Sequence, residues 1–359
     1  MRNWITRHKA VHIWLLCDIL LFVVYFLAIR TRQAADAFSA FSQVLKDGYA
    51  RLWYLFPFSV VEWFYVAFIL GMLAWLAVLL HRLRTWKGRR LHAAYGCILG
   101  MLCLAMTAGA VYCLGWGVNY YASGFQEKSG VYAQPVTADE LERVTLYFTE
   151  KLAETADRIP RDEQNVFAVS RDEIFAGSTR VYDNFSREFP FLSRTDRVPK
   201  KMFFSRLFSA MNFTGFYSPY TGESNLNVDS PACLLPANIA HELAHQRGIA
   251  SEQECNFLAI AASTGSDDVV YQYSGYLMGY IQLSNALYRA DRERWAAVRG
   301  LLPEAVLADL RYHSEYWAQF DGFTAQVSTK IYDSSLKSYG QTDGIQSYGT
   351  VVDLLVAYY

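Results

Sequence analysis

The chain has 359 residues, of which 53% are hydrophobic and only 19% are charged. At roughly 150 residues per domain, this length suits about two folded units and excludes a single small module. The composition is too apolar for a disordered chain and indicates that part of the chain lies in lipid.

The net charge of −1 conceals two parts of opposite sign. Residues 1–118 carry 12 Lys and Arg against 4 Asp and Glu, whereas residues 119–359 carry 21 against 30. A protein that binds nucleic acid needs a basic surface on its folded domain, and the larger part of this chain is acidic. We therefore expect no nucleic-acid partner.

Three apolar runs in the first third of the chain are each long enough to cross a bilayer as a helix, which takes about 20 residues. They are Val11–Ile29, Phe58–Leu80 and Leu91–Val118. Asp18 and Glu62 interrupt the first two runs, and we expect these carboxylates near a helix end or against a neighbouring helix. The sequence thus predicts that residues 1–118 form a membrane anchor with three transmembrane helices, in contact with the lipid bilayer.

Basic residues indicate the orientation of this anchor, because short cytoplasmic loops collect Lys and Arg. The loop between the second and third runs contains Arg82, Arg84, Lys87, Arg89 and Arg90 and no acidic residue. Arg2, Arg7 and Lys9 precede the first run. The stretch Thr31–Pro57, expected as a loop, mixes both signs. We predict a multi-pass protein of the bacterial cell membrane with a cytoplasmic N-terminus, so that everything after Val118 lies outside the cytoplasm.

Residues 119–359 have the sequence pattern of a globular domain, in which stretches of mixed polar and apolar residues are separated by Gly and Pro. Thr137–Ile159 is predicted to be a helix opened by a Thr-x-x-Glu capping pattern. Phe213–Val228 has strand character and is predicted to form a hairpin or edge strand. Beyond Asp267 the chain is predicted to be mostly helical. The sequence leaves open whether the two cysteines of this domain pair: Cys233 and Cys255.

The segment Pro236–Gly248 contains the pattern His-Glu-x-x-His. His241 and His245 are four residues apart, so on a helix they lie one turn apart on one face and can hold one metal ion. Glu242 can reach the open coordination position and take a proton from a water that the metal activates. The pattern therefore predicts a Zn²⁺ cofactor and a hydrolase with Glu242 as its general base.

A zinc site of this type needs a third protein ligand, and two glutamates follow Gly248 within a few residues. Ser251 suits the N-cap of a second helix, which places Glu254 at the capping-box position. Glu252 is then free to face the metal. The sequence favours Glu252 as the third ligand and keeps Glu254 as the alternative.

A hydrolase of this kind also needs a group that stabilises the oxyanion formed during hydrolysis, which a Tyr or a His can supply, and such electrostatic help is usually a large part of catalysis. The candidates in distinctive segments are Tyr217, Tyr220, Tyr273 and His313. Because the chain has 25 Tyr, ordinary packing is the alternative for each of them.

These motifs carry two resemblances. His241-Glu-Leu-Ala-His followed by Glu252-Gln-Glu-Cys-Asn256 is similar to the zinc sites of integral-membrane metallopeptidases of the heat-shock and prenyl-protein-processing type. Their third ligand lies in a Glu-x-x-Ala-Asp motif, in which Asn256 would replace the Asp. Nearly the whole chain resembles a bacterial membrane-protein family catalogued as a domain of unknown function, which carries the zincin motif. The matching segments are the three apolar runs, Gly215-Phe-Tyr-Ser-Pro-Tyr-Thr-Gly-Glu, the His-Glu helix, Tyr273-Ser-Gly-Tyr and Leu336-Lys-Ser-Tyr-Gly-Gln…Gly344-Ile-Gln-Ser-Tyr.

We therefore expect a mainly α fold, in which the three-helix anchor precedes a zincin-like α+β metallopeptidase domain with a small sheet edge beside the active-site helix. The expected function is that of a membrane-anchored zinc metallopeptidase whose substrates are peptides or proteins of the cell envelope. One alternative is a non-catalytic, metal-binding envelope scaffold or sensor. Another is a hydrolase of a non-peptide amide in cell-wall material.

Overall fold

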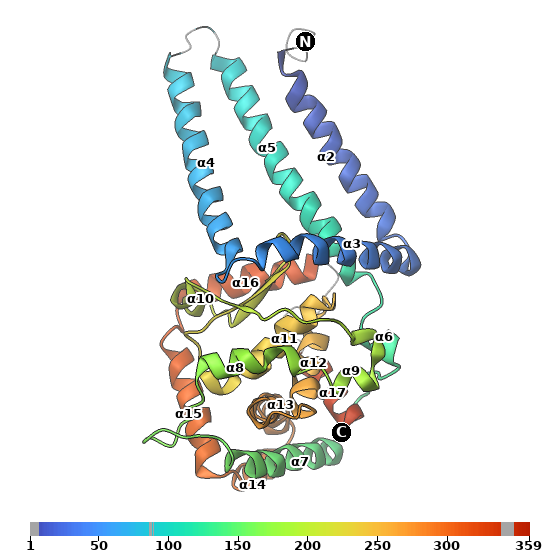
Figure 1. Ribbon diagram of the computed structural model, residues 1–359, viewed down its shortest axis with the longest axis vertical. Coiled ribbons are helices and arrows are strands. Elements are labelled where there is room, and N and C mark those ends of the chain that lie inside the picture. The colour runs from blue at the N-terminus through green and yellow to red at the C-terminus, as the bar shows by residue number, and fades with distance from the viewer. Residues whose placement is uncertain (1–6, 86–87, 89, 339–347) are drawn as a thin grey trace. The chain divides into compact units, whose positions relative to one another are not determined.

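The computed structural model describes residues 7–85, 88, 90–338 and 348–359 (Figure 1). It divides into two compact units: the first comprises Met1–Ala122 and Pro219–Gly222, and the second comprises Ser123–Ser218 and Glu223–Tyr359. The described chain is mainly helical with a small three-stranded sheet, which confirms the coarse fold prediction. Four parts of the sequence interpretation lie outside the described residues: Arg2, Lys87, Arg89 and the segment 339–347.

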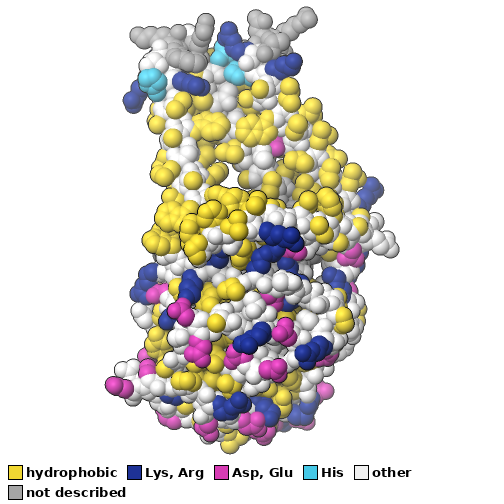
Figure 2. Space-filling view, in the orientation of Figure 1, with side chains coloured by type: hydrophobic (Ala, Val, Ile, Leu, Met, Phe, Trp, Pro, Cys, Tyr) yellow, Lys and Arg dark blue, Asp and Glu magenta, His cyan; other side chains and the backbone are white. Residues whose placement is uncertain are grey.

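Three helices of the first unit are long and apolar enough to cross a membrane, as predicted. They are α2 (Lys9–Ala28), α4 (Val60–Thr85) and α5 (Arg90–Gly115), followed by a short 3-10 turn at Gly117–Tyr120. Hydrophobic side chains cover much of the visible surface of these helices (Figure 2). Such a surface is compatible with a membrane anchor.

The stretch between the first two apolar helices is a helix, and the prediction of a loop at Thr31–Pro57 is wrong. Helix α3 (Arg32–Trp53) starts after Thr31, whose hydroxyl accepts a hydrogen bond of 3.2 Å from the Ala34 N–H. This Thr is a standard N-cap residue. In Figure 1, α3 lies across the ends of the three apolar helices.

The two carboxylates of the apolar runs occupy the kinds of position that the sequence predicts. Asp18 is buried in α2 and accepts a hydrogen bond of 2.8 Å from the Thr107 hydroxyl of α5. That hydroxyl in turn accepts a bond of 2.7 Å from the Trp14 indole. Glu62 is buried in the first turn of α4. Asp18 therefore joins two helices, and Glu62 lies near a helix end.

The second unit is mainly helical, and several of its helices pack against α13. The bounds are α6 (Phe125–Ser129), α7 (Ala138–Ala156), α8 (Arg171–Gly177), α9 (Phe185–Glu188), α10 (Ser205–Ala210), α11 (Leu235–Gln246), α12 (Glu252–Thr264), α13 (Val269–Ala290), α14 (Arg292–Arg299), α15 (Glu304–Ala318), α16 (Phe323–Ser338) and α17 (Tyr348–Tyr358), with 3-10 turns at Ser178–Arg180, Pro190–Leu192 and Ala232–Leu234. Buried apolar side chains of α7, α11, α12 and α13 form much of the core. The predicted capping box at Thr137 and Glu140 opens α7, which ends at Ala156 rather than Ile159.

The sheet contains β1 (Lys200–Lys201), β2 (Gly215–Ser218) and β3 (Glu223–Leu226) in the order β1-β3-β2. Strands β2 and β3 form the predicted antiparallel hairpin, with Tyr217 opposite Ser224. Strand β3 is central and buried, whereas β2 is an edge strand. Helix α11 packs against both strands, so the hairpin flanks the helix that carries the two histidines.

Candidate metal centre

Helix α11 presents His241 and His245 on one face because they are separated by one turn. Pro236 stands in its first turn, where the missing N–H costs no hydrogen bond. Ile239 and Leu243 are fully buried and fix the other side of the helix in the core. The helix is therefore anchored by its apolar face.

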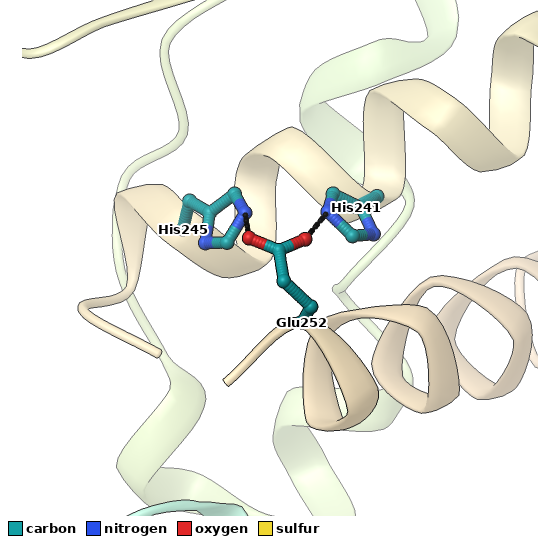
Figure 3. Close-up of side chains that lie close together, drawn as sticks. All are labelled: His241, His245 and Glu252. Atoms are coloured by element: carbon teal, nitrogen blue, oxygen red, sulfur yellow. Dashed lines mark ion pairs between the residues drawn. The ribbon is translucent and has the colours of Figure 1, made fainter. Parts of the chain in front are cut away.

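The chain turns sharply after α11. Gly248 has φ +84°, a left-handed conformation that glycine adopts without a steric penalty. The turn allows α12 to begin at Glu252 and to pack against α11. Glu252 thus stands at the N-terminus of the second helix, facing the histidines of the first (Figure 3).

Three side chains converge at this place. Glu252 Oε2 lies 3.2 Å from His241 Nε2, and Glu252 Oε1 lies 3.5 Å from His245 Nε2 (Figure 3). One potential ligand atom of each of the three side chains lies within 4.8 Å of the other two. His241 and Glu252 are partly buried, and His245 is buried. The structure brings together the three residues that the sequence favours as metal ligands.

Hydrogen bonds on the far side of each imidazole fix its proton. His241 Nδ1 donates to Asn256 Oδ1 at 2.9 Å, and His245 Nδ1 donates to the Ile249 carbonyl at 2.8 Å. Because both acceptors are oxygens, the neutral rings carry hydrogen on Nδ1 and a lone pair on Nε2. Two lone pairs and a carboxylate then face one another, and a shared cation stabilises such an arrangement. Two imidazole nitrogens and one carboxylate oxygen fit a catalytic zinc ion.

The short distances between these side chains also shift the pKa values of His241 and Glu252. Burial alone would lower the pKa of His241, but the hydrogen bond and charge of Glu252 raise it overall. Burial alone would raise the pKa of Glu252, but the charge of His245 and the hydrogen bond from His241, both in their protonated forms, lower it to about 2. Both shifts have one cause, which is the attraction between the negative Glu252 carboxylate and the positive charge of a protonated imidazole.

Glu242 lies beside the cluster and is buried, with 4% of its surface exposed. Burial raises the pKa of Glu242 to about 8; the charge of His241 opposes this shift and that of Glu252 adds to it. Among the described residues, Glu242 Oε2 has no hydrogen-bond partner. A buried carboxylate oxygen without a partner is costly, so such atoms are usually explained by a functional role or an additional bound group.

Gly215 of β2 makes room for the Glu242 carboxylate. A Cβ atom at Gly215 would lie 2.8 Å from Glu242 Oε1 and 2.8 Å from the Asn225 carbonyl oxygen. Both separations are shorter than real Cβ atoms show. The missing side chain of Gly215 therefore leaves the space that the Glu242 carboxylate and the Asn225 carbonyl occupy.

For the Zn²⁺ hydrolase that the sequence predicts, we expect Gly215→Ala to lower turnover by about 10²-fold, because a shift of about 1 Å in a catalytic group costs that much. Zinc content should stay unchanged, since the atoms nearest to the added methyl group belong to Glu242 and to the Asn225 backbone, not to His241, His245 or Glu252. The measurement is turnover together with metal analysis. The control is Gly349→Ala, where a Cβ meets nothing within 4 Å. Equal turnover in both variants would contradict the assigned role of Gly215.

Glu254, the alternative third ligand, does not join the cluster. Its carboxylate accepts hydrogen bonds from the Phe125 N–H at 2.8 Å and the Gln126 N–H at 3.0 Å, at the start of α6. Ser251 is the N-cap of α12, as predicted, and its hydroxyl accepts a bond of 3.4 Å from the Glu254 N–H. The carboxylate of Glu254 thus caps α6 rather than its own helix.

The structure places the other catalytic candidates differently. The Tyr273 hydroxyl donates to Asp309, which pairs with Arg161, and it takes no part in the cluster. His313 Nε2 accepts a bond of 3.1 Å from the Trp317 indole, within α15. Each side chain is thus hydrogen-bonded to a partner outside the cluster, and its catalytic role stays a prediction.

The remaining two tyrosines differ from each other in position. Tyr217 lies on the same face of β2 as Gly215, since side chains alternate along a strand. That face is the one turned toward Glu242. Tyr220 belongs to the turn that is part of the first unit, where its hydroxyl donates to the Ala108 carbonyl at 3.2 Å. Of the four candidates, only Tyr217 is thus on the strand face that is turned toward Glu242.

The two cysteines of the second unit are not paired. Cys233 and Cys255 are free and buried. The Cys255 thiol lies 3.3 Å from His245 Nδ1 and 3.4 Å from the Ile249 carbonyl oxygen. Burial raises the pKa of the Cys255 thiol well above its usual value, so it packs behind the histidine as a neutral group.

Sequence reasoning missed one residue of the site. The hydroxyl of Tyr332, on α16, donates a hydrogen bond of 2.7 Å to Glu252 Oε1. Its ring packs edge-on against Phe213, with 5.4 Å between the ring centroids. No motif surrounds Tyr332, and 80 residues separate it from Glu252, so no local signal connects the two.

For the Zn²⁺ site that the sequence predicts, we expect Tyr332→Phe to weaken zinc binding by about 10-fold or more, the usual cost of removing a partner that orients a metal ligand. The ring that packs on Phe213 is kept, so thermal stability without metal should change little. Chelator competition measures the affinity. Tyr316→Phe is the matched control, because its hydroxyl also donates to a carboxylate, that of Asp229, at 2.7 Å. An unchanged zinc affinity in Tyr332→Phe would refute the orienting role.

Comparison with known proteins gives a family and no function. The model of the family described as "Protein of unknown function (DUF3810)" matches residues 38–356. No curated protein and no solved structure matches the chain significantly. The match covers nearly the entire chain, and the protein therefore belongs to the DUF3810 family of unknown function.

Proposed function

We propose that this protein is a membrane-anchored, zinc-dependent metallopeptidase. The observation that supports this most directly is the convergence of His241, His245 and Glu252 beside the buried carboxylate of Glu242. Structural zinc sites are almost always closed by four protein ligands, whereas catalytic sites use three and keep one position open. A three-residue cluster beside an acid–base group therefore favours catalysis over a non-catalytic scaffold or sensor.

Each side chain of the site has a defined part in this proposal. A bound zinc ion supplies a Lewis acid for the scissile carbonyl and lowers the pKa of water. Glu242 accepts a proton from the attacking water at Oε2 and later delivers it to the leaving amine. Asn256 and Ile249 hold the two imidazoles with Nε2 toward the cluster. Tyr332 holds Glu252 in place.

The sheet edge favours a peptide as the substrate. Strand β2 pairs with β3 on one side only among the described strands, and Gly215 in this strand adjoins Glu242. An edge strand offers backbone N–H and C=O groups to an extended chain. A peptide bound along β2 would thus have its backbone close to the general base.

The test uses the full-length protein in detergent, loaded with zinc, against a broad peptide library. We expect cleavage that a chelator abolishes and added zinc restores. Zinc binding without cleavage of any peptide would favour the scaffold or sensor. Cleavage confined to cell-wall fragments would instead identify a hydrolase of a non-peptide amide at the same site.

We also propose that the anchor lies in the bacterial cell membrane with its N-terminus in the cytoplasm. Basic residues gather at one end of the three apolar helices (Figure 2). The described ones are Arg7, Lys9, Arg82, Arg84 and Arg90. Since α5 starts at this basic end, the chain leaves the anchor at the opposite end, outside the cytoplasm. Substrates would then be proteins or peptides of the cell envelope.

Reporter fusions after Tyr121 test this orientation. A reporter that works only outside the cytoplasm should be active there, and one that works only in the cytoplasm should be silent. Fusions after Arg84 should show the reverse pattern and serve as the matched control. Cytoplasmic activity of the fusion after Tyr121 would invert the orientation and redirect the substrate search to cytosolic proteins.

A further inference from the structure

The exposed face of α3 is apolar. The side chains of Phe41, Val44, Leu45 and Leu52 are 57%, 71%, 52% and 59% exposed. Their spacing of three, four and eleven residues from Phe41 places them on one side of the helix. We call these four residues the α3 stripe. On the surface of a soluble protein, a helix turns such a stripe toward the core instead.

The polar face of α3 is turned inward. Ser39 donates a hydrogen bond of 2.7 Å to the Asn119 side chain. Lys46 is 2% exposed and lies over the Trp116 ring, 5.0 Å from its centroid. The Tyr49 hydroxyl donates to the Pro219 carbonyl. These contacts are all within the first unit and fix the rotation of α3, so the α3 stripe must face outward.

The composition of α3 excludes a fourth crossing. Its 22 residues are long enough to span about 30 Å, but they include five charged side chains. Helix α3 is not among the helices apolar enough to cross a membrane. It connects two helices that are, α2 and α4. A helix that is amphipathic but not apolar overall lies along the bilayer surface instead.

The α3 stripe is continuous with a surface that faces lipid in the proposed anchor. The Trp53 ring at the end of α3 packs against Phe64 of α4, with 5.0 Å between the ring centroids. The Phe64 side chain is 42% exposed, and many other apolar side chains of α4 are exposed to a similar degree. One apolar surface therefore extends from α4 onto α3.

We propose that α3 is an interfacial helix, with the α3 stripe inserted among the lipids at the end of the anchor opposite its basic end. Lipid is the occupant because the stripe continues the apolar surface of α4 and because its inward face is already fixed by polar contacts. The proposal rests on the membrane anchor of the proposed function, but it is independent of the metal site.

Depth-dependent quenching tests this placement in the full-length protein, reconstituted in lipid nanodiscs. In a Cys17→Ala background, which removes the exposed cysteine, an environment-sensitive fluorophore is attached at Val44→Cys. Lipids carry a nitroxide either near the head group or deep in the acyl chain, and iodide is the quencher in water. Labels at Leu70→Cys, within α4, and at Leu301→Cys, exposed in the second unit, provide the deep and aqueous references.

We expect the label at position 44 to lose more fluorescence with the shallow nitroxide than with the deep one, and little with iodide. The label at position 70 should show the opposite order of depths. Strong quenching by iodide at position 44 would place the stripe in water, and protection from all three quenchers would place it against protein; either result overturns the proposal. A second label at Leu52→Cys, on the same stripe, guards against a local effect at one position. Failure at position 70 would instead refute the membrane anchor itself.

Discussion

Replacing Glu242 by Gln should lower peptide turnover by roughly 10²- to 10⁴-fold, the contribution typical of general acid–base catalysis. The amide has nearly the shape of the carboxylate but cannot accept the proton of the attacking water. Zinc content should be unchanged, because the three ligands lie on other side chains. Turnover of a cleaved library peptide and metal analysis of the same sample give both quantities.

Glu315→Gln is the control for this variant, since Glu315 is an exposed glutamate of α15. It should retain full turnover. If Glu242→Gln also remained fully active with its zinc bound, the assigned mechanism would be wrong, even though the metal site would stand.

Glu252→Ala should abolish zinc retention during dialysis, whereas Glu254→Ala should keep it. Glu252 contributes an oxygen to the cluster, and losing a ligand should cost more than the roughly 10- to 100-fold that loss of an orienting partner costs. Glu254 instead binds two backbone N–H groups of α6. Metal analysis after dialysis of the two purified variants separates these roles.

Glu254→Ala should instead lower the free energy of unfolding by about 2 kcal/mol, the scale of hydrogen bonds to a charged group. Thermal unfolding of the full-length protein measures the direction of this change. Loss of zinc from Glu254→Ala alone would show that the cap and the ligand are assigned the wrong way round.

The residues that the sequence could identify are those whose relation is local. His241, Glu242 and His245 lie within one and a half turns of helix, where spacing alone sets which side chains share a face. Glu252 follows from the same logic, because Gly248 and Ser251 mark where one helix stops and the next starts. Helix periodicity and caps are enough to assemble this much of the site.

Partners distant in sequence could not be found in this way. Tyr332 reaches Glu252 from 80 residues away, and Glu254 leaves its local capping position for amides 129 and 128 residues away. Asn256 shows a milder case. It lacks the charge of the Asp in the similar motif, yet its amide oxygen still accepts the hydrogen bond from His241.

Two elements of the fold were missed for different physical reasons. The stretch that forms α3 is predicted to be a loop because it contains charged residues of both signs. Its apolar residues nevertheless recur at helical spacing. Strand β1 consists of Lys200 and Lys201 alone, and it exists because β3 provides a partner for its backbone. Two lysines carry no strand signal, so tertiary contacts override propensity here.

The tight connection between His245 and Glu252 also limits how this protein can evolve. The His245 imidazole is bonded to the carbonyl of Ile249, which lies inside the connection itself, and Gly248 holds the backbone in its turn. An inserted residue would displace both the hydrogen bond that orients His245 and the start of the helix that carries Glu252. We therefore expect this connection to keep its length, while insertions elsewhere in the chain would leave both contacts in place.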